Sequence, residues 1–118
     1  MPGTFNREQE EAITHKGGPL MVLAGPGSGK TLVITYRVKW LIENAGVHPS
    51  NILVITFTRA AAEEMKKRFF MFDGMENAPV TFGTFHSIFF MILRYAYRYY
   101  QRRCKAAIHK RDDGEYGT

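Results

Sequence analysis

The sequence predicts one α/β domain in which helices flank a parallel sheet. Two short apolar runs, at residues 19–24 and 52–57, have the composition of strands that are buried on both faces of a sheet. A third strand or strand end is expected at residues 80–85, and segments with helical periodicity separate the runs. Because strands that alternate with helices are joined by crossover connections, the strands are expected to run parallel.

The first helix is expected within residues 5–18. Asn6 is a suitable N-cap residue, and Gln9 stands at the third helical position, where a capping box uses Glu or Gln. Gly17 and Gly18 are expected to end this helix, since glycine readily adopts the left-handed conformation that follows a helix.

Three further helices are predicted, from near Gly29 to about Asn44, from after Thr58, and from about Phe85 onwards. Each contains apolar residues that recur at helical spacing and are therefore expected to be buried. These predicted stripes are Ile34, Val38, Leu41 and Ala45 in the first of the three helices, Ala61, Met65, Phe69 and Phe72 in the second, and Phe85, Phe89 and Ile92 in the third.

The composition is typical of a folded protein with a single domain. The chain has 118 residues, of which 45% are hydrophobic, and this is enough for a buried core. No apolar run has the length of a membrane span, and the sequence carries no secretory signal. Cys104 is its one cysteine, so no internal disulfide can form. We therefore expect a cytoplasmic protein with no membrane partner.

Positive charge is concentrated toward the C-terminal end of the chain. The net charge is +5, and no acidic residue occurs between Glu76 and Asp112. Such a stretch either binds a polyanion or forms a solvated helix face, and the charge distribution leaves both possibilities open. The basic residues of this interval are Arg94, Arg98, Arg102, Arg103, Lys105, Lys110 and Arg111.

A glycine-rich turn after the first apolar run matches a phosphate-binding loop. The pattern G-x-x-x-x-G-K-[ST] is met except at its first position, where Ala24 stands. The glycines let successive backbone N–H groups converge on phosphate oxygens, Lys30 reaches the β- and γ-phosphates, and the Thr31 hydroxyl ligates Mg²⁺. The predicted nucleotide-binding residues of the loop are Ala24, Gly25, Pro26, Gly27, Ser28, Gly29, Lys30 and Thr31.

Four segments occur along the chain in the order "FNREQEEAI", "AGPGSGKT", "TFTRAAAEEMKKR" and "TFGTFHSIFFMILR". They resemble the Q motif and motifs I, Ia and Ib of UvrD/Rep/PcrA-type superfamily 1 DNA helicases, over about residues 4–94. The resemblance implies the N-terminal part of the first RecA-like motor domain, with a P-loop NTPase fold. It also implies an ATP-dependent helicase or translocase acting on single-stranded DNA, with ATP and Mg²⁺ as cofactors and with Lys30 and Thr31 as catalytic residues.

The resemblance further implies how the base of the nucleotide is recognised. Gln9 matches the glutamine that recognises adenine in the family. A carboxamide suits this role because its donor and its acceptor can pair with two adjacent groups of adenine. The alternative role for Gln9 is the capping box, which needs no ligand.

Two segments are implied to contact single-stranded DNA. In motif Ia, Phe57 offers a ring for base stacking, while Thr58 and Arg59 can meet backbone phosphates. A core aromatic is the alternative for Phe57, and "RAA" stands here where relatives often carry "NKA", which shifts the cation by one residue. The implied residues of motif Ib are Thr84, His86 and Ser87.

The family also needs parts that this sequence does not show. Motif II supplies an Asp-Glu pair after a buried strand, but none of the acidic pairs here follows an apolar run; they are Glu10-Glu11, Glu63-Glu64 and Asp112-Asp113. A second motor domain, which brings arginines to the γ-phosphate, is also missing. We therefore expect the chain to be inactive by itself and to work with the remainder of the helicase, domains 1B, 2A and 2B, in the parent protein or in trans.

Two other functions stay open. The chain could be a binding module that holds nucleotide or DNA without turnover, which the missing motif II favours. A small-molecule P-loop kinase is the weaker alternative, because it gives no account of motifs Ia and Ib. In the domain organisation that we expect, residues 1–105 form the N-terminal part of helicase domain 1A and residues 106–118 form a polar, disordered tail.

Overall fold

The computed structural model describes residues 5–25, 27 and 29–116, with side chains described as far as residue 107. Pro26 and Ser28 of the predicted phosphate-binding loop lie outside the described residues. The chain forms two compact units, Met1–Gly83 and Thr84–Thr118, and each is described by itself.

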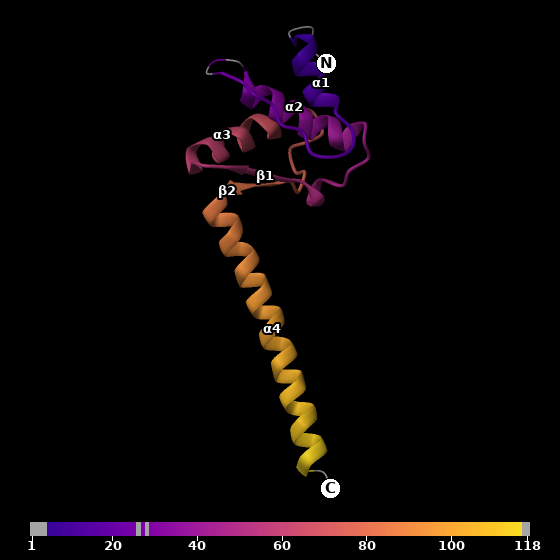
Figure 1. Ribbon diagram of the computed structural model, residues 1–118, viewed down its shortest axis with the longest axis vertical. Helices are drawn as coiled ribbons and strands as arrows, with labels where there is room; N and C mark the ends of the chain where they lie inside the picture. The colour runs from indigo at the N-terminus through magenta and orange to yellow at the C-terminus, as the bar shows by residue number, and fades with distance from the viewer. Residues whose placement is uncertain (1–4, 26, 28, 117–118) are drawn as a thin grey trace. The chain divides into compact units, whose positions relative to one another are not determined.

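The first unit contains helices and two short strands (Figure 1). The elements are, in order, α1 (Arg7–Thr14), α2 (Lys30–Glu43), the 3-10 helix η1 (Pro49–Asn51), β1 (Leu53–Thr56), α3 (Arg59–Phe70) and β2 (Thr81–Thr84). The second unit is formed by α4 (Phe85–Tyr116). The α/β class predicted from the sequence is confirmed.

β1 and β2 form a two-stranded parallel sheet, and α3 connects them. The Thr81 N–H donates to the Ile52 carbonyl at 3.2 Å, next to the start of β1. On β1, Val54 is buried against the core, whereas Leu53 and Ile55 on the other face are 45% and 37% exposed. The helices therefore cover one face of β1 among the described residues.

The core of the first unit is built around Phe69, which is fully buried. Its ring centroid lies 5.6 Å from that of Phe82 and 6.1 Å from that of Phe72, so one ring joins α3, β2 and the loop after α3. The other buried members of this cluster are Val38, Ile52, Val54, Met65, Met75 and Val80. Met65 and Phe69 are buried members of the stripe predicted for α3. Of the stripe predicted for α2, Val38 is buried and Leu41 half-buried, whereas Ile34 and Ala45 are exposed.

The predicted strand at residues 19–24 is wrong. The structure assigns no strand there, and the side chains of Leu20, Met21, Val22 and Leu23 are 46%, 85%, 55% and 91% exposed. A strand is stabilised by hydrogen bonds to a neighbouring strand. In the described part of the chain, β1 and β2 pair only with each other, so this apolar run has no ladder partner.

The buried stripe predicted for the last helix is also wrong. Phe85, Phe89 and Ile92 are 42%, 60% and 51% exposed. A helix buries its apolar stripe only where another element packs on it. Along the described part of α4 after the first turn, side chains are exposed except for Ile88 and the half-buried Cys104.

The backbone of α4 is helical to Tyr116, beyond the predicted domain boundary at residue 105. The division into a domain and a tail at that residue stays a prediction. Within the described residues, no helix is both long enough and apolar enough to span a bilayer.

The central position of Phe69 leads to a prediction about stability. Phe69→Ala should lower the free energy of unfolding by about 3–5 kcal/mol, because it removes a fully buried ring and leaves a cavity. Met71→Ala is a suitable control, since Met71 follows the same helix but is 82% exposed, and it should change stability by no more than about 0.5 kcal/mol. Urea denaturation followed by circular dichroism measures both. Similar losses for the two variants would contradict this description of the core.

Candidate functional site

α2 begins directly after the glycine-rich turn, in which Gly27 and Gly29 have left-handed backbone. Gly29 is the N-cap residue with φ 78° and ψ 25°, and Gly27 has φ 76°. The first intrahelical bond of α2 runs from the Val33 N–H to the Gly29 carbonyl at 3.0 Å. The preceding N–H groups are those that a helix leaves without an internal partner, and the helix dipole adds positive potential there. This terminus therefore suits an anion.

Glycine is needed at positions 27 and 29 because the backbone there has a positive φ, and not because a side chain would lack space. A Cβ at Gly27 would meet nothing within 4 Å, and one at Gly29 would lie 3.7 Å from Gln9 Nε2. Left-handed backbone is costly for residues with a Cβ. The distance at Gly29 also places the predicted adenine-recognising glutamine beside the loop.

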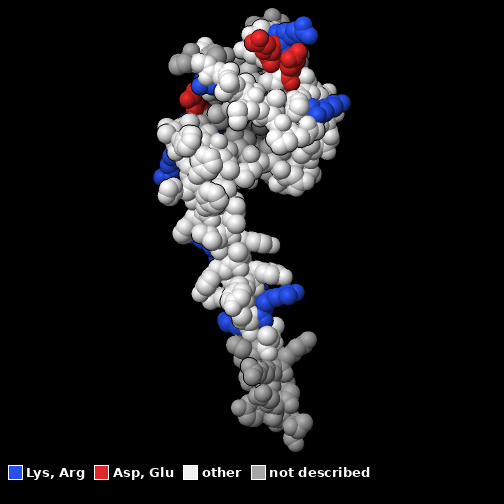
Figure 2. All heavy atoms as spheres, in the orientation of Figure 1, with Lys and Arg blue, Asp and Glu red and all other residues white. Residues whose placement is uncertain are grey.

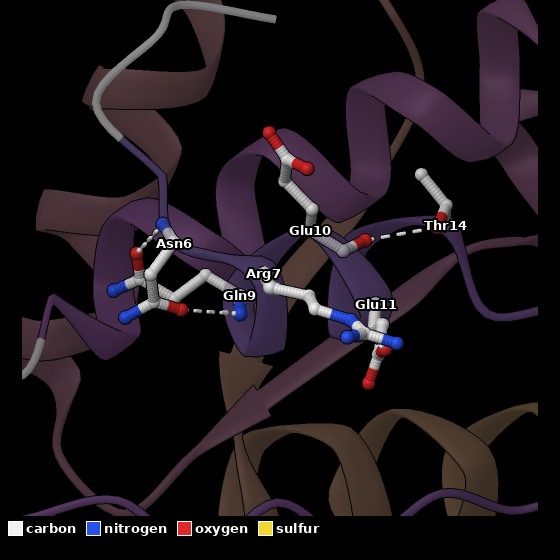
Figure 3. Close-up of polar contacts among 6 residues, drawn as sticks. All are labelled: Asn6, Arg7, Gln9, Glu10, Glu11 and Thr14. Atoms are coloured by element: carbon white, nitrogen blue, oxygen red, sulfur yellow. Dashed lines mark hydrogen bonds and ion pairs between the residues drawn. The ribbon is translucent and has the colours of Figure 1, made fainter.

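Gln9 forms the predicted capping box with Asn6 at the start of α1 (Figure 3). The Gln9 N–H donates to Asn6 Oδ1 at 2.8 Å, and the Asn6 N–H donates to Gln9 Oε1 at 3.0 Å. The alternative role of Gln9 as a cap is thus observed. Base recognition by Gln9 stays a prediction.

A cavity of about 490 Å³ lies between α1, residues 20–25 and the first half of α2. Its volume is within the range of small-molecule sites, about 300–1,000 Å³. It brings Gln9 together with Ala24, Gly25 and Lys30 of the predicted loop. Thr31 is half-buried on the first turn of α2, next to Lys30. The other lining residues are Asn6, Glu8, Ala12, Leu20, Val22, Leu23, Val33, Ile34 and Arg37.

Two charged residues of this cavity were not predicted from the sequence. Glu8 lies on the first turn of α1, one residue before Gln9. Arg37 lies on α2, and its Nη1 atom donates to the carbonyls of Ala12, Ile13 and His15. One signal could have found Arg37, because it stands about two helical turns after Lys30 and so shares its face of α2.

The residues of motif Ia follow the C-terminal end of β1. Thr58 is the N-cap of α3, where its Oγ1 accepts from the Ala61 N–H at 3.1 Å. Arg59 is the first residue of α3 and is exposed. The Phe57 ring is 91% exposed, so the alternative of a core position is not observed. A contact of these residues with DNA stays a prediction.

The residues of motif Ib cap α4. The Ser87 N–H donates to Thr84 Oγ1 at 3.1 Å, and the Thr84 N–H donates to Ser87 Oγ at 2.9 Å. Both hydroxyls are therefore engaged in a reciprocal cap, a structural role that the sequence analysis did not assign. His86 is exposed on the first turn of the helix. The DNA contact of Thr84, His86 and Ser87 stays a prediction.

Two of the acidic pairs lie within helices. Glu10-Glu11 lies in α1 and Glu63-Glu64 lies in α3. Glu11 pairs with Arg7 at 3.2 Å and Glu64 with Arg68 at 2.8 Å, which are exposed contacts along each helix. Among the residues that the structure describes, no group of three His, Cys, Asp or Glu side chains could hold a metal ion.

With this geometry in place, comparison with known proteins identifies the family. The N-terminal domain of the UvrD/REP helicases matches residues 5–116, nearly the whole chain. The chain therefore belongs to the UvrD/REP helicase family. The expected resemblance is confirmed.

Individual relatives agree with this assignment. The chain is 48% identical over 90 residues to the ATP-dependent DNA helicase PcrA of Staphylococcus epidermidis and 46% identical over 90 residues to PcrA of Staphylococcus aureus. It is 48% identical over 92 residues to the protein YjcD of Bacillus subtilis. These matches cover about three quarters of the chain, 75–76%, and 12% of each relative. The chain is thus homologous to a short N-terminal region of much longer proteins.

The double role of Gln9 leads to a prediction about the cap. Gln9→Glu should keep the stability of the chain, because a carboxylate accepts from the Asn6 N–H and suits a helix N-terminus. Gln9→Leu should lower the free energy of unfolding by about 0.5–1.5 kcal/mol, since the Asn6 N–H loses its acceptor. Thermal unfolding of both variants measures the difference. Equal stability of the Leu variant and the wild type would contradict the cap.

Proposed function

We propose that this chain is the ATP-binding segment of an ATP-dependent DNA helicase or translocase that acts on single-stranded DNA. The observation that carries the proposal is the cavity beside the N-terminus of α2, which both Gln9 and Lys30 line. One end of such a site needs an amide for the base, and the other needs N–H groups and a cation for phosphates. Membership of the UvrD/REP helicase family supports the same assignment.

The residues present fit a nucleoside triphosphate bound with Mg²⁺. Lys30 would contact the terminal phosphates, and the N–H groups of the loop and first turn would hold their oxygens. Mg²⁺ is usually held by substrate phosphates, water and few protein ligands. The Thr31 hydroxyl can serve as such a ligand, so a cluster of acidic residues is not required.

The DNA-binding part of the proposal rests on motif Ia. Phe57 is 91% exposed and follows the C-terminal end of a parallel strand, the edge at which α/β sheets bind ligands. Arg59 adds an exposed cation at the start of α3. A ring beside a cation is the arrangement that stacks on a base and contacts the adjoining phosphate.

α4 adds a second basic surface. Arg94, Arg98 and Arg102 follow one another at intervals of four residues and so share a helix face. Figure 2 shows basic but no acidic side chains along the described part of α4 on the face in view, in agreement with the sequence between Glu76 and Asp112. This surface suits a polyanion.

A non-catalytic binding module is the second candidate. It is favoured by the positions of Glu10-Glu11 and Glu63-Glu64, which lie within helices rather than after a strand. The two candidates differ in turnover and share the nucleotide site. A small-molecule kinase has no observation in its favour.

Lys30→Ala should weaken binding of ATP about tenfold or more, because a hydrogen bond to a charged group contributes roughly 1.5–3 kcal/mol. The Lys30 side chain is exposed, so the fold should be retained. Lys67→Ala is the matched control, since it removes the same charge from α3, away from the cavity. Isothermal titration calorimetry measures all three proteins. Equal ATP affinity in the wild type and Lys30→Ala would contradict the assignment of this loop as a phosphate-binding loop.

The 118-residue chain by itself should show no appreciable ATP hydrolysis with or without single-stranded DNA, because Glu10-Glu11 and Glu63-Glu64 lie within helices and not after a strand, where motif II would supply the base. A phosphate-release assay with the wild type and Lys30→Ala tests this. DNA-stimulated hydrolysis that is lost in Lys30→Ala would show the prediction to be wrong. Glu8→Gln would then show whether the carboxylate that lines the cavity acts as the base.

Single-stranded DNA should bind with an affinity that falls steeply as salt rises, because each phosphate contact releases counterions. Phe57→Ala should weaken binding by about 1–3 kcal/mol without changing the salt slope, since a stacking ring is lost but no charge. Arg59→Ala should lower the slope by about one phosphate contact. Fluorescence anisotropy over a salt series measures both effects.

Two variants control for general effects on this binding. Met71→Ala removes an exposed apolar side chain after the opposite end of α3, and Lys67→Ala removes an equivalent charge from the same helix. Neither variant should weaken DNA binding as much as Phe57→Ala does. If Met71→Ala weakens DNA binding as much as Phe57→Ala does, stacking at Phe57 is refuted.

A further inference from the structure

We propose that Arg37 is a positioning residue that fixes α1 against α2 and thereby sets the preference of the nucleotide cavity for an adenine base. The inference rests on the proposed function, and it assigns to Arg37 a role that the phosphate-binding loop and Gln9 do not have. Arg37 also lines the cavity, but its hydrogen bonds go to carbonyls at the end of α1, and the proposed role acts through α1.

The observation is a cluster of three carbonyl oxygens within hydrogen-bond distance of one guanidinium nitrogen, whose two hydrogens they share. Arg37 Nη1 donates to the carbonyls of Ala12 at 2.9 Å, Ile13 at 3.1 Å and His15 at 3.2 Å. These carbonyls belong to the last turn of α1 and its C-cap, where a helix leaves carbonyls without internal partners. A cation is also favoured at this end by the helix dipole. Arg37 therefore caps α1 from another helix.

The opposite end of α1 is held by the neighbouring residue of α2. The ring of Tyr36 meets that of Phe5 edge to face, with centroids 5.0 Å apart, just before the N-cap of α1. Two adjacent residues of α2 thus fasten both ends of a helix of eight residues. Because an isolated helix of this length is not stable in water, the position of α1 depends on these contacts and on the burial of Ala12 and Ile13.

Gln9 lies one turn before Ile13 on the same helix, so a shift of α1 would move its amide. That amide now stands with Nε2 3.7 Å from the Cβ position of Gly29. Lys30 belongs to α2 itself and does not depend on α1. Loosening of α1 should therefore reduce recognition of the base while leaving attraction for the phosphates intact.

The test compares Mg²⁺-ATP with Mg²⁺-tripolyphosphate, which has the phosphates but no base. In Arg37→Met, the preference for ATP over tripolyphosphate should fall about tenfold, the factor that corresponds to loss of one or two hydrogen bonds. Affinity for tripolyphosphate should stay within about twofold of the wild type, a difference below half a kcal/mol. Arg37→Lys, which can still donate to a carbonyl, should have an intermediate preference.

Two reference variants distinguish a shift of α1 from the loss of the Gln9 amide and from the loss of one positive charge. Gln9→Glu should lose the preference while α1 remains in place, because the cap is kept and the amide donor is removed. Arg7→Met removes the same charge as Arg37→Met from the exposed side of α1 and should behave as the wild type. An Arg7→Met variant with the same loss as Arg37→Met would overturn the proposal.

Hydrogen exchange of the free protein gives a readout that needs no nucleotide. Amides of residues 10–14 should exchange faster in Arg37→Met, while amides of α3 and β1 keep their wild-type protection. If the wild type binds neither ATP nor tripolyphosphate, the proposed function fails, and this exchange pattern still decides whether Arg37 holds α1.

Besides a matching loss in Arg7→Met, three results would overturn the role of Arg37. The first is unchanged protection of α1 in Arg37→Met, and the second is an equal loss of affinity for ATP and tripolyphosphate. If Arg37→Met does not fold, Arg37→Lys is judged by the same two criteria. Loss of folding in both variants is the third, since it would make Arg37 a requirement of the whole unit rather than of α1.

Discussion

The cavity depends on the packing of α2 on two sides at once. On one side, Val38 is buried in the core with α3 and β1, and the ring of Tyr36 meets Phe72 at 4.9 Å between centroids. On the other side, the same Tyr36 ring meets Phe5, and Arg37 holds the last turn of α1. α2, which follows the phosphate-binding loop, is thus fixed to the core, and α1, which carries Gln9, is fixed to α2.

As a result, the phosphate end and the base end of the cavity are held in place by different contacts. Lys30 and the N–H groups around it belong to an element with a buried face, so their geometry follows that of the core. The amide of Gln9 belongs to a helix of eight residues whose position is set by contacts at its ends. Contacts to phosphates and to a base can therefore differ in rigidity, although they lie in one cavity.

The sequence predicted the elements whose signals are local. The start of α1 could be read from Asn6 and Gln9, because a capping box involves residues only three positions apart. The end of α2 near Asn44 could be predicted because the helical pattern stops there, and Gly46, which follows it, has the left-handed φ of 69° that follows many helices. Met65 and Phe69 were predicted as core because apolar residues at helical spacing face a common side.

The features that the sequence did not reveal depend on distant partners. Composition marks residues 19–24 as apolar, but a strand also needs a neighbour for its hydrogen bonds, and neither β1 nor β2 supplies one in the described chain. The exposure of Phe89 and Ile92 has the same cause, because helical spacing shows which residues share a face and not what covers it. Arg37 contacts backbone carbonyls, which have no side-chain signature in a sequence.

The exposed run from Leu20 to Leu23 has a consequence for the chain in solution. Uncharged apolar segments with unpaired backbone are the segments from which intermolecular β-pairing and aggregation start. This run leads directly into the phosphate-binding loop, so self-association there would bury one wall of the cavity. Lys16 and Lys30 flank it, and flanking charges of this kind oppose such pairing. The charge of the lysine proposed to hold phosphate would thus also oppose self-association, and its neutralisation by a bound anion would weaken that effect.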